Sequence, residues 1–163
     1  MGHSVTAFLG LATNYEERFA ARPFHGTVSL EKGLVLTPLS DFVIDAIADG
    51  ETPDIRIRTA GAAMSRNRSL VYIETEYFGG YGGQGAVLWR NGIVEFEATS
   101  WDERVMIEFQ ERHDNPINQA LEKGFGLEAA SKTDQFDTVG LGRLRSTDRI
   151  LEELGVNLYA DEP

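Results

Sequence analysis

The sequence predicts a single α+β domain whose sheet is largely antiparallel, and three observations support this prediction. The chain has 163 residues, of which 42% are hydrophobic, so it can form one ordinary apolar core. Strand-like segments follow one another over residues 70–98 without helices between them. Segments with helical spacing come before and after this region, and runs of strands flanked by helices are typical of α+β folds. We place the domain at residues 1–159, with three to four helices and a frayed polar tail at residues 160–163.

The first third of the chain combines short strands with short helices. Alternating apolar residues indicate strands, and Ser, Thr or Asn before apolar residues at helical spacing indicates a capped helix. The predicted elements are, in order, a strand at residues 4–9, a helix from Thr13 or Asn14 to about residue 21, strands at residues 27–30 and 34–39, and a helix capped by Ser40 that ends at Gly50. After Pro53, two isoleucines alternate with two arginines, and residues 59–66 fit either a short helix or a loop.

The centre of the chain is predicted to be a three-stranded meander at about residues 70–98. Its second and third strands, at residues 86–90 and 93–97, flank Asn91-Gly92. This dipeptide is the strongest short-range signal for a tight hairpin, because both of its residues accept positive φ angles. Residues 105–109 are a candidate fourth strand. Two more helices are expected, one from Asn115-Pro116 to about Lys123 and one at residues 147–154 that Ser146 caps and Gly155 ends.

Charge and composition restrict the classes of function. The chain has 26 acidic and 15 basic side chains, for a net charge of −11. Such a surface repels nucleic-acid phosphates. It either attracts a basic protein or serves only to keep the protein soluble. The lack of cysteine excludes disulfides, thiolate metal sites and a cysteine nucleophile. No apolar run approaches the roughly 18 residues of a membrane helix, and no secretory signal is visible. We therefore expect a cytoplasmic protein with a basic protein partner and without nucleic-acid or membrane partners.

A glycine-rich segment at residues 79–85 is the first candidate for a functional surface. Gly80, Gly82 and Gly85 form G-x-G-x-x-G, a pattern whose backbone N–H groups can fold over phosphates. The lysine strand and the catalytic loops of kinases are missing, and so is a Walker A lysine. The alternative is a flexible hairpin loop whose glycines take positive φ angles or let another segment pack closely. We expect alanine at Gly82 and Gly83 to leave the fold largely intact and to damage binding.

A resemblance starts from the same segment. Its residues are Glu74-Thr75-Glu76-Tyr77-Phe78-Gly79-Gly80, then Gly82, Gln84 and Ala86-Val87-Leu88-Trp89, with Val139-Gly140-Leu141-Gly142-Arg143 further on. This pattern resembles a strand–loop–strand segment of uncharacterised bacterial proteins. The resemblance implies a bacterial, cytoplasmic origin and no particular activity. By analogy of size and charge, some small acidic bacterial proteins are immunity proteins, which inhibit toxins exchanged between competing cells.

Two pairs of carboxylates form a further candidate site. Glu74 and Glu76 share one face of a strand, and Glu95 and Glu97 share one face of another strand. If the pairs faced each other, they could bind Mg²⁺ or Ca²⁺, or one carboxyl could act as an acid with a raised pKa. The alternation with apolar neighbours favours the simpler interpretation, in which all four lie on the solvent face of an antiparallel sheet.

The sequence thus leaves two classes of function open, and it favours a protein that is not an enzyme. The first is an acidic protein-binding module, such as an immunity-type inhibitor of a basic toxin or enzyme. The second is a nucleotide-, phosphate- or metal-binding domain that uses residues 79–85, either as a binding domain alone or as an enzyme. A homo-oligomer that packs the loop on a second copy is a third reading. We predict no catalytic residue, no metal ligand and no cofactor. The predicted binding residues are Tyr77, Phe78, Gly80, Tyr81, Gly82, Gly83, Gln84, Trp101, Asp102, Glu108 and Glu111.

Overall fold

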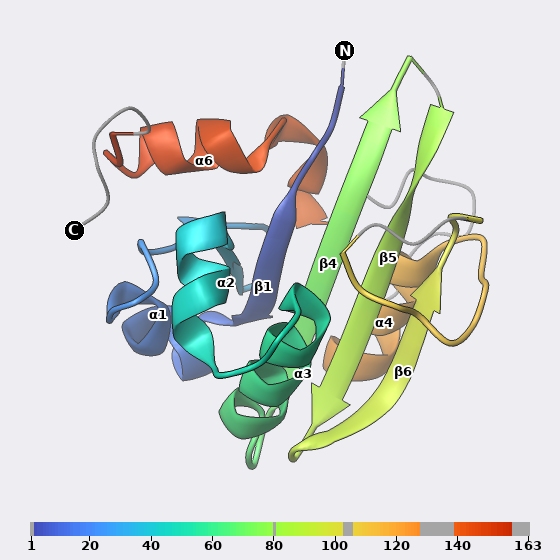
Figure 1. The fold of residues 1–163 in the computed structure, drawn as a ribbon, viewed down its shortest axis with the longest axis horizontal. Helices are drawn as coiled ribbons and strands as arrows, with labels where there is room; N and C mark the ends of the chain where they lie inside the picture. The colour runs from blue at the N-terminus through green and yellow to red at the C-terminus, as the bar shows by residue number, and fades with distance from the viewer. Residues whose placement is uncertain (1, 80, 103–105, 128–138, 158–163) are drawn as a thin grey trace.

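One antiparallel six-stranded sheet organises the chain, with helices on both of its faces (Figure 1). The computed structural model describes residues 2–79, 81–102, 106–127 and 139–157. The strands are β1 (Thr6–Leu11), β2 (Val28–Ser29), β3 (Leu34–Pro38), β4 (Ser69–Phe78), β5 (Tyr81–Arg90) and β6 (Ile93–Thr99). Their order across the sheet is β2-β3-β1-β4-β5-β6. The α+β class and the antiparallel sheet predicted from the sequence are therefore confirmed.

The helices divide between the two faces of the sheet. In chain order they are α1 (Ala12–Ala20), α2 (Asp41–Ile47), α3 (Pro53–Met64), α4 (Pro116–Phe125), the short 3-10 turn η1 (Leu141–Arg143) and α6 (Thr147–Glu153). Helices α1, α2 and α3 cover one face, which we call the front face, and they share a core with Phe8, Tyr72 and Trp89. Helix α4 and η1 cover the other face, the back face, over a core that includes Ile73 and Leu88. Both cores are continuous across the central strands.

The predicted turns and caps are largely present, because short-range chemistry specifies them. Asn91 and Gly92 connect β5 to β6 with φ angles of 52° and 82°. The Ser40 hydroxyl accepts a hydrogen bond from the Val43 N–H at 3.2 Å, and the Ser146 hydroxyl accepts one from the Arg149 N–H at 3.1 Å. Each serine hydroxyl therefore accepts a hydrogen bond from one of the N–H groups that have no partner within the helix at its start.

Other boundaries differ from the sequence prediction. Helix α1 begins after Leu11, so neither Thr13 nor Asn14 caps it, and α2 ends before Gly50. The isoleucine–arginine alternation after Pro53 belongs to helix α3. Thr52 caps that helix by accepting a hydrogen bond from the Ile55 N–H at 3.3 Å, and Pro53 occupies its first turn, where proline is favoured. The helix-start residues Thr52 and Pro53 therefore determine the conformation of this segment more strongly than the alternation of isoleucine and arginine does.

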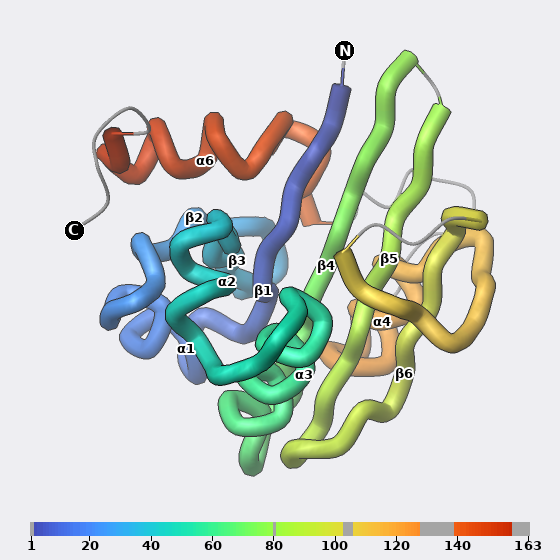
Figure 2. Tube along the Cα trace, in the orientation of Figure 1, coloured from blue at the N-terminus to red at the C-terminus, as the bar shows by residue number. Residues whose placement is uncertain are grey.

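The prediction of a fourth strand at residues 105–109 is also wrong, as the described residues 106–109 show. Residues 106–109 are not in a strand. They cross in front of β4 and β5 on the side of α2 and α3, as Figure 2 shows. Ile107 and Phe109 are buried in the front-face core. Their apolar alternation therefore reflects burial against the face of the sheet, without a ladder of backbone hydrogen bonds. Val105 lies outside the described residues.

Candidate functional site

Among the described residues, the most exposed aromatic side chains lie at the tip of the β4–β5 hairpin. Phe78 and Tyr81 end and begin these strands, are paired in register, and are 81% and 83% exposed. Paired residues of an antiparallel ladder project from the same face, and Glu76, two residues before Phe78, belongs to that face as well. We call Phe78 and Tyr81 the aromatic tip. In Figure 1 it lies at the end of the sheet where the N-terminus emerges.

The glycines behind the tip lie within strand β5 and make room for aromatic rings. A Cβ atom at Gly83 would overlap the indole of Trp101, and one at Gly85 would overlap the ring of Phe109. Gly82 has a φ of 131°, and a Cβ there would collide with the backbone carbonyl of Glu76. The structure thus shows that these glycines permit close packing. The expected tolerance of alanine at Gly82 and Gly83 is wrong, since both positions lack the space for a methyl group. Gly80 lies outside the described residues.

Trp101 and Asp102 join the aromatic tip through this packing. The Trp101 ring covers Gly83, two residues from Tyr81, and its backbone N–H donates to the Thr99 hydroxyl at 3.0 Å. Asp102 is exposed and forms an ion pair with Arg112. Two parts of the predicted site that are far apart in the sequence therefore come together. The signal for this contact was a glycine at every second position of a strand, which marks a surface that another segment covers.

Gln84 is buried and connects two elements of the fold, whereas Phe78 and Tyr81 are exposed. Its side chain is 1% exposed, accepts a hydrogen bond from the Ile117 N–H at 2.9 Å, and donates one to the Tyr77 hydroxyl at 2.9 Å. It thereby supplies a hydrogen-bond acceptor for an N–H group in the first turn of α4 and connects that helix to the sheet. Gln84 is not available to an external partner in this conformation.

The predicted acidic residues Glu108 and Glu111 are both exposed and lie on different parts of the surface. The backbone of Glu108 is held from both sides, by the carboxylate of Asp54 at 3.3 Å and the guanidinium of Arg58 at 2.5 Å. The Glu111 carboxylate lies 3.3 Å from the His113 ring, beside the outer edge of β6.

The two carboxylate pairs do not form one site, because β5 separates β4 from β6. Glu74 is opposite Gly85 on β5, while Glu97 is opposite Val87. Among the residues that the structure describes, no group of three or more His, Asp or Glu side chains is arranged to hold a metal ion. The solvent-face interpretation is wrong for Glu74 and Glu97, which are 3% and 7% exposed. Their partners in the predicted pairs, Glu76 and Glu95, are exposed.

Glu74 is a buried carboxyl with incomplete hydrogen bonding. The Tyr72 hydroxyl donates to its Oε1 atom at 2.7 Å, and Oε2 is buried without a hydrogen bond of normal geometry from any described residue. Burial raises the pKa of Glu74 to about 7, although Tyr72 and the nearby backbone amides of Met106 and Ile107 oppose the rise. Burial and the adjacent carboxylate also raise the pKa of Tyr72 well above its usual value. A carboxyl of this kind gains or loses its proton near neutral pH.

Glu97 is buried with a cationic partner. The Arg58 guanidinium donates to its Oε2 atom at 2.6 Å and to Asp54 at 2.5 Å. Although burial lowers the pKa of Arg58, Glu97 and Asp54 outweigh it and raise that pKa above its usual value. The second oxygen, Oε1, is buried without a hydrogen-bond partner among the described residues. This oxygen belongs to a residue that lines a surface pocket of about 370 Å³ at the outer edge of β6.

A second pocket, of about 540 Å³, opens on the side of the molecule where α2 and α6 begin. Its walls include His25, Asp41, Met106 and Asp148. The His25 ring lies 3.4 Å from the Ser40 hydroxyl. Thr6, also in the wall, is the cross-strand neighbour of Glu74. Glu74 is therefore paired with a residue of the pocket wall but does not itself line the pocket.

Comparison with known proteins gives no family for the chain: no family model, curated protein or solved structure matches it. The resemblance to bacterial strand–loop–strand segments therefore stays a prediction. Within the described part of the chain, no helix is both long and apolar enough to cross a membrane.

Proposed function

We propose that this chain is an acidic protein-binding domain that docks the aromatic tip onto a basic protein. The observation that carries the proposal is the exposure of Phe78 and Tyr81, at 81% and 83%, side by side at the end of a long hairpin. Large aromatic residues supply most of the binding energy in many protein interfaces. Two of them exposed together therefore support an interaction surface more than a solvated turn.

The tip is held by ordered structure, which favours tight binding. Strands β4 and β5 pair over ten residues each, up to Phe78 and Tyr81 themselves. Trp101 packs on Gly83 behind the tip, and the Ser4 hydroxyl donates to the Glu76 carboxylate at 3.1 Å. A surface that is already ordered loses less conformational entropy when it binds.

The charge of the chain supports a basic partner. The net charge is −11. The exposed carboxylate of Glu76 lies two residues before Phe78 on β4, and the exposed Asp102 follows Trp101, whose ring covers Gly83. Opposite charges speed the encounter of two proteins and disfavour wrong partners. An immunity-type inhibitor, which blocks a basic toxin or enzyme, is the specific form of this function that we propose.

The nucleotide- or phosphate-binding alternative has less support in the geometry. A phosphate cradle needs free backbone N–H groups in an open loop. Here Gly83 and Gly85 are strand residues covered by Trp101 and Phe109.

The test is affinity capture from the native host at low salt with the wild-type chain and with Phe78→Ser/Tyr81→Ser. We expect the wild type to recover a basic protein in stoichiometric amount that high salt releases. The double variant should bind that protein at least tenfold more weakly. The matched control is Ile55→Ser, which also removes an exposed apolar side chain, on α3.

Two outcomes would contradict the proposal. One is a folded double variant that binds the captured protein as the wild type does. The other is a wild-type chain that forms a dimer in light scattering and a double variant that is monomeric, because the tip would then pack on a second copy.

A further inference from the structure

We infer that the pocket of about 540 Å³ beside the start of β1 binds a small organic ammonium ion that carries an apolar body. Its wall combines residues of β1, the loop before β2, the start of α2, the segment after β6, and α6 with the residues that follow it. Neither Phe78 nor Tyr81 belongs to this wall. The site is therefore separate from the aromatic tip, and the inference does not depend on the proposed function.

The first argument is that the fold builds the pocket from elements that are fixed to one another. In Figure 1, α6 (red) lies above α2 (cyan) and beside β1 (blue). The Leu39 N–H, just before α2, donates to the Thr6 carbonyl at 2.8 Å, and the Thr6 N–H donates to the hydroxyl of Thr147 in α6 at 2.9 Å. The starts of two helices are thus held beside the first residue of β1. A pocket with ordered walls costs a ligand less on binding.

The second argument is the apolar part of the wall. Leu39 and Leu151 are each 2% exposed, and Phe42, Met106 and Val156 are half-buried. Pockets of about 300–1,000 Å³ with mainly apolar walls and a few polar groups are typical of small-molecule sites. The body of the ligand is therefore expected to be apolar.

The third argument concerns which polar groups of the wall are free. The hydroxyls of Ser40 and Thr147 already accept hydrogen bonds from backbone N–H groups at 3.2 Å and 2.9 Å. The carboxylates of Asp41 and Asp148 are exposed, and neither forms an ion pair or a side-chain hydrogen bond with a described residue. These two carboxylates are therefore the groups that remain available to a ligand.

The two carboxylates also give the charge of the ligand. No lysine or arginine lines the pocket, and His25 is the only other titratable side chain in the wall. A helix start favours an acidic residue in its first turn, which explains each aspartate on its own helix. It does not explain why both line one pocket, where like charges repel and a cation relieves the repulsion. The ring of Phe42 adds an aromatic face, which attracts ammonium groups.

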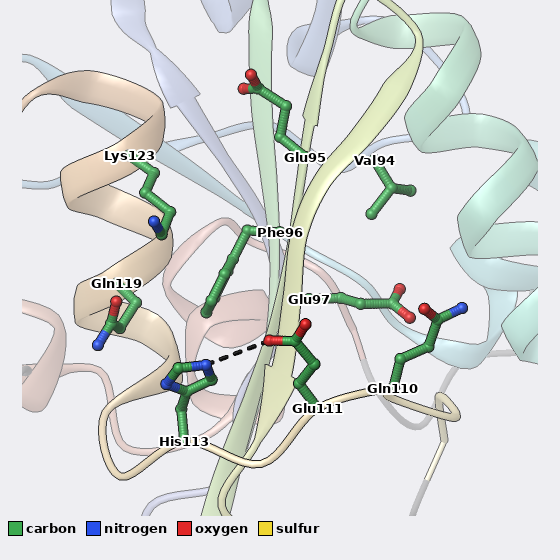
Figure 3. A pocket seen from close by; sticks show the side chains of 9 residues that line it. All are labelled: Val94, Glu95, Phe96, Glu97, Gln110, Glu111, His113, Gln119 and Lys123. Atoms are coloured by element: carbon green, nitrogen blue, oxygen red, sulfur yellow. Dashed lines mark hydrogen bonds and ion pairs between the residues drawn. The ribbon is translucent and has the colours of Figure 1, made fainter.

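The pocket at the outer edge of β6 provides a contrast (Figure 3). Its carboxylates already have partners: Glu97 with Arg58, Glu95 with Arg90 and Glu111 with His113. A cationic ligand there would have to displace a side chain of the protein itself. Between α2 and α6 it would meet carboxylates without a partner among the described residues, so this pocket is the better cation site.

The probe is tryptamine, which joins an ammonium group to an apolar ring system, titrated into the ¹⁵N-labelled full chain and followed by NMR. We expect saturable shift changes at the amides of residues 39–42 and 147–151. Tryptophol keeps the ring system without the charge, and butylamine keeps the charge and imitates a lysine side chain. Each should bind at least tenfold more weakly than tryptamine. Indolepropionate, which has the opposite charge, should bind most weakly.

Variants of the chain then locate the site. Asp41→Asn/Asp148→Asn should weaken tryptamine at least tenfold and leave tryptophol unchanged, because it removes the charge and keeps the apolar wall. The matched control is Asp49→Asn/Glu152→Gln. It removes two exposed carboxylates near the other ends of the same two helices and should bind tryptamine as the wild type does.

Three outcomes would overturn the inference. Equal losses in the two double variants, with shift changes spread over the acidic surface, would mean that tryptamine responds to net charge alone. Tryptophol that binds as tightly as tryptamine would mean that the carboxylates do not recognise the ligand. Butylamine that binds as tightly would mean that the apolar wall adds nothing. Phe78→Ser/Tyr81→Ser should bind tryptamine normally, so a failure here is distinguishable from a failure of the proposed function.

Discussion

The two faces of the β4–β5 hairpin bury polar groups in opposite ways. On the back face, each polar side-chain atom of Thr75 and Gln84 has a partner: Thr75 contacts His3 at 2.7 Å and the Val5 N–H at 2.8 Å, and Gln84 joins α4 to Tyr77. On the front face, one oxygen of the buried Glu74 carboxyl has no hydrogen bond of normal geometry from the described residues, although the Met106 and Ile107 amides lie near this carboxyl. Glu97 of the adjacent strand shares this property.

This difference separates structural from functional polar groups. A completely hydrogen-bonded buried side chain holds two elements together and has no capacity for a ligand. A buried oxygen without a partner lowers stability unless something binds it. The back face therefore explains how α4 is attached. On the front face, the buried Glu74 carboxyl is a place where a proton can bind. On the back face, α4 also carries a buried oxygen without a partner among the described residues, Oδ1 of Asn118.

The largest effect is expected on the back face, from Gln84→Ala. The change would leave the Ile117 N–H without its partner, remove one hydrogen bond of Tyr77 and open a cavity beside α4. The unpaired N–H costs about 1–3 kcal/mol and the cavity adds to this, so we expect a loss of about 4 kcal/mol in the free energy of unfolding. Urea unfolding measures it. Gln110→Ala, at an exposed position, is the control, and an equal loss in both variants would show that Gln84 is not a tie between α4 and the sheet.

Gly85→Ala tests the aromatic covering of the front face. The new methyl group would overlap the ring of Phe109, and overpacking of this kind costs about 1–3 kcal/mol. We expect a loss near 3 kcal/mol, again from urea unfolding. The double variant Gly85→Ala/Phe109→Val should recover part of the loss attributed to Gly85→Ala, because the smaller side chain leaves room. Strictly additive effects would mean that the two residues do not contact each other.

Glu74→Gln sharpens the comparison through pH. Because the pKa of Glu74 is raised from 4.5 to about 7, the folded chain binds this proton more tightly than the unfolded chain. The contribution of Glu74 to the free energy of unfolding is therefore greatest at low pH, and it falls as the pH rises between 4.5 and about 7. We expect this group to contribute a loss of about 2 kcal/mol between pH 5 and pH 8. Glu74→Gln should remove that part of the pH dependence, and Glu76→Gln, two residues on and exposed, should keep it. A wild-type slope in Glu74→Gln would show that another group titrates.

The elements that local chemistry specifies could be predicted from the sequence. Asn91-Gly92 at the hairpin turn and the serine caps Ser40 and Ser146 were correct, because each acts on residues within one turn of the chain. At α3 the sequence left residues 59–66 open between a helix and a loop, and the structure has a helix that starts at the Thr52 cap and Pro53. The aromatic tip was partly predictable, since Phe78 and Tyr81 flank a turn of glycines.

The sequence by itself determined the α+β class, the central meander and the acidic charge, since these follow from local patterns and composition. Only the tertiary structure decided what the glycines and the carboxylates do. Gly83 and Gly85 lie under Trp101 and Phe109 because the segment that follows β6 in the chain crosses back over β5. Glu74 is buried by that same return, although its alternation with apolar neighbours is that of a solvated strand. A contact between segments distant in the sequence leaves only a weak pattern, such as glycine at the alternate positions 83 and 85, and that pattern does not identify the covering segment. Burial depends on what covers a strand as much as on the strand itself.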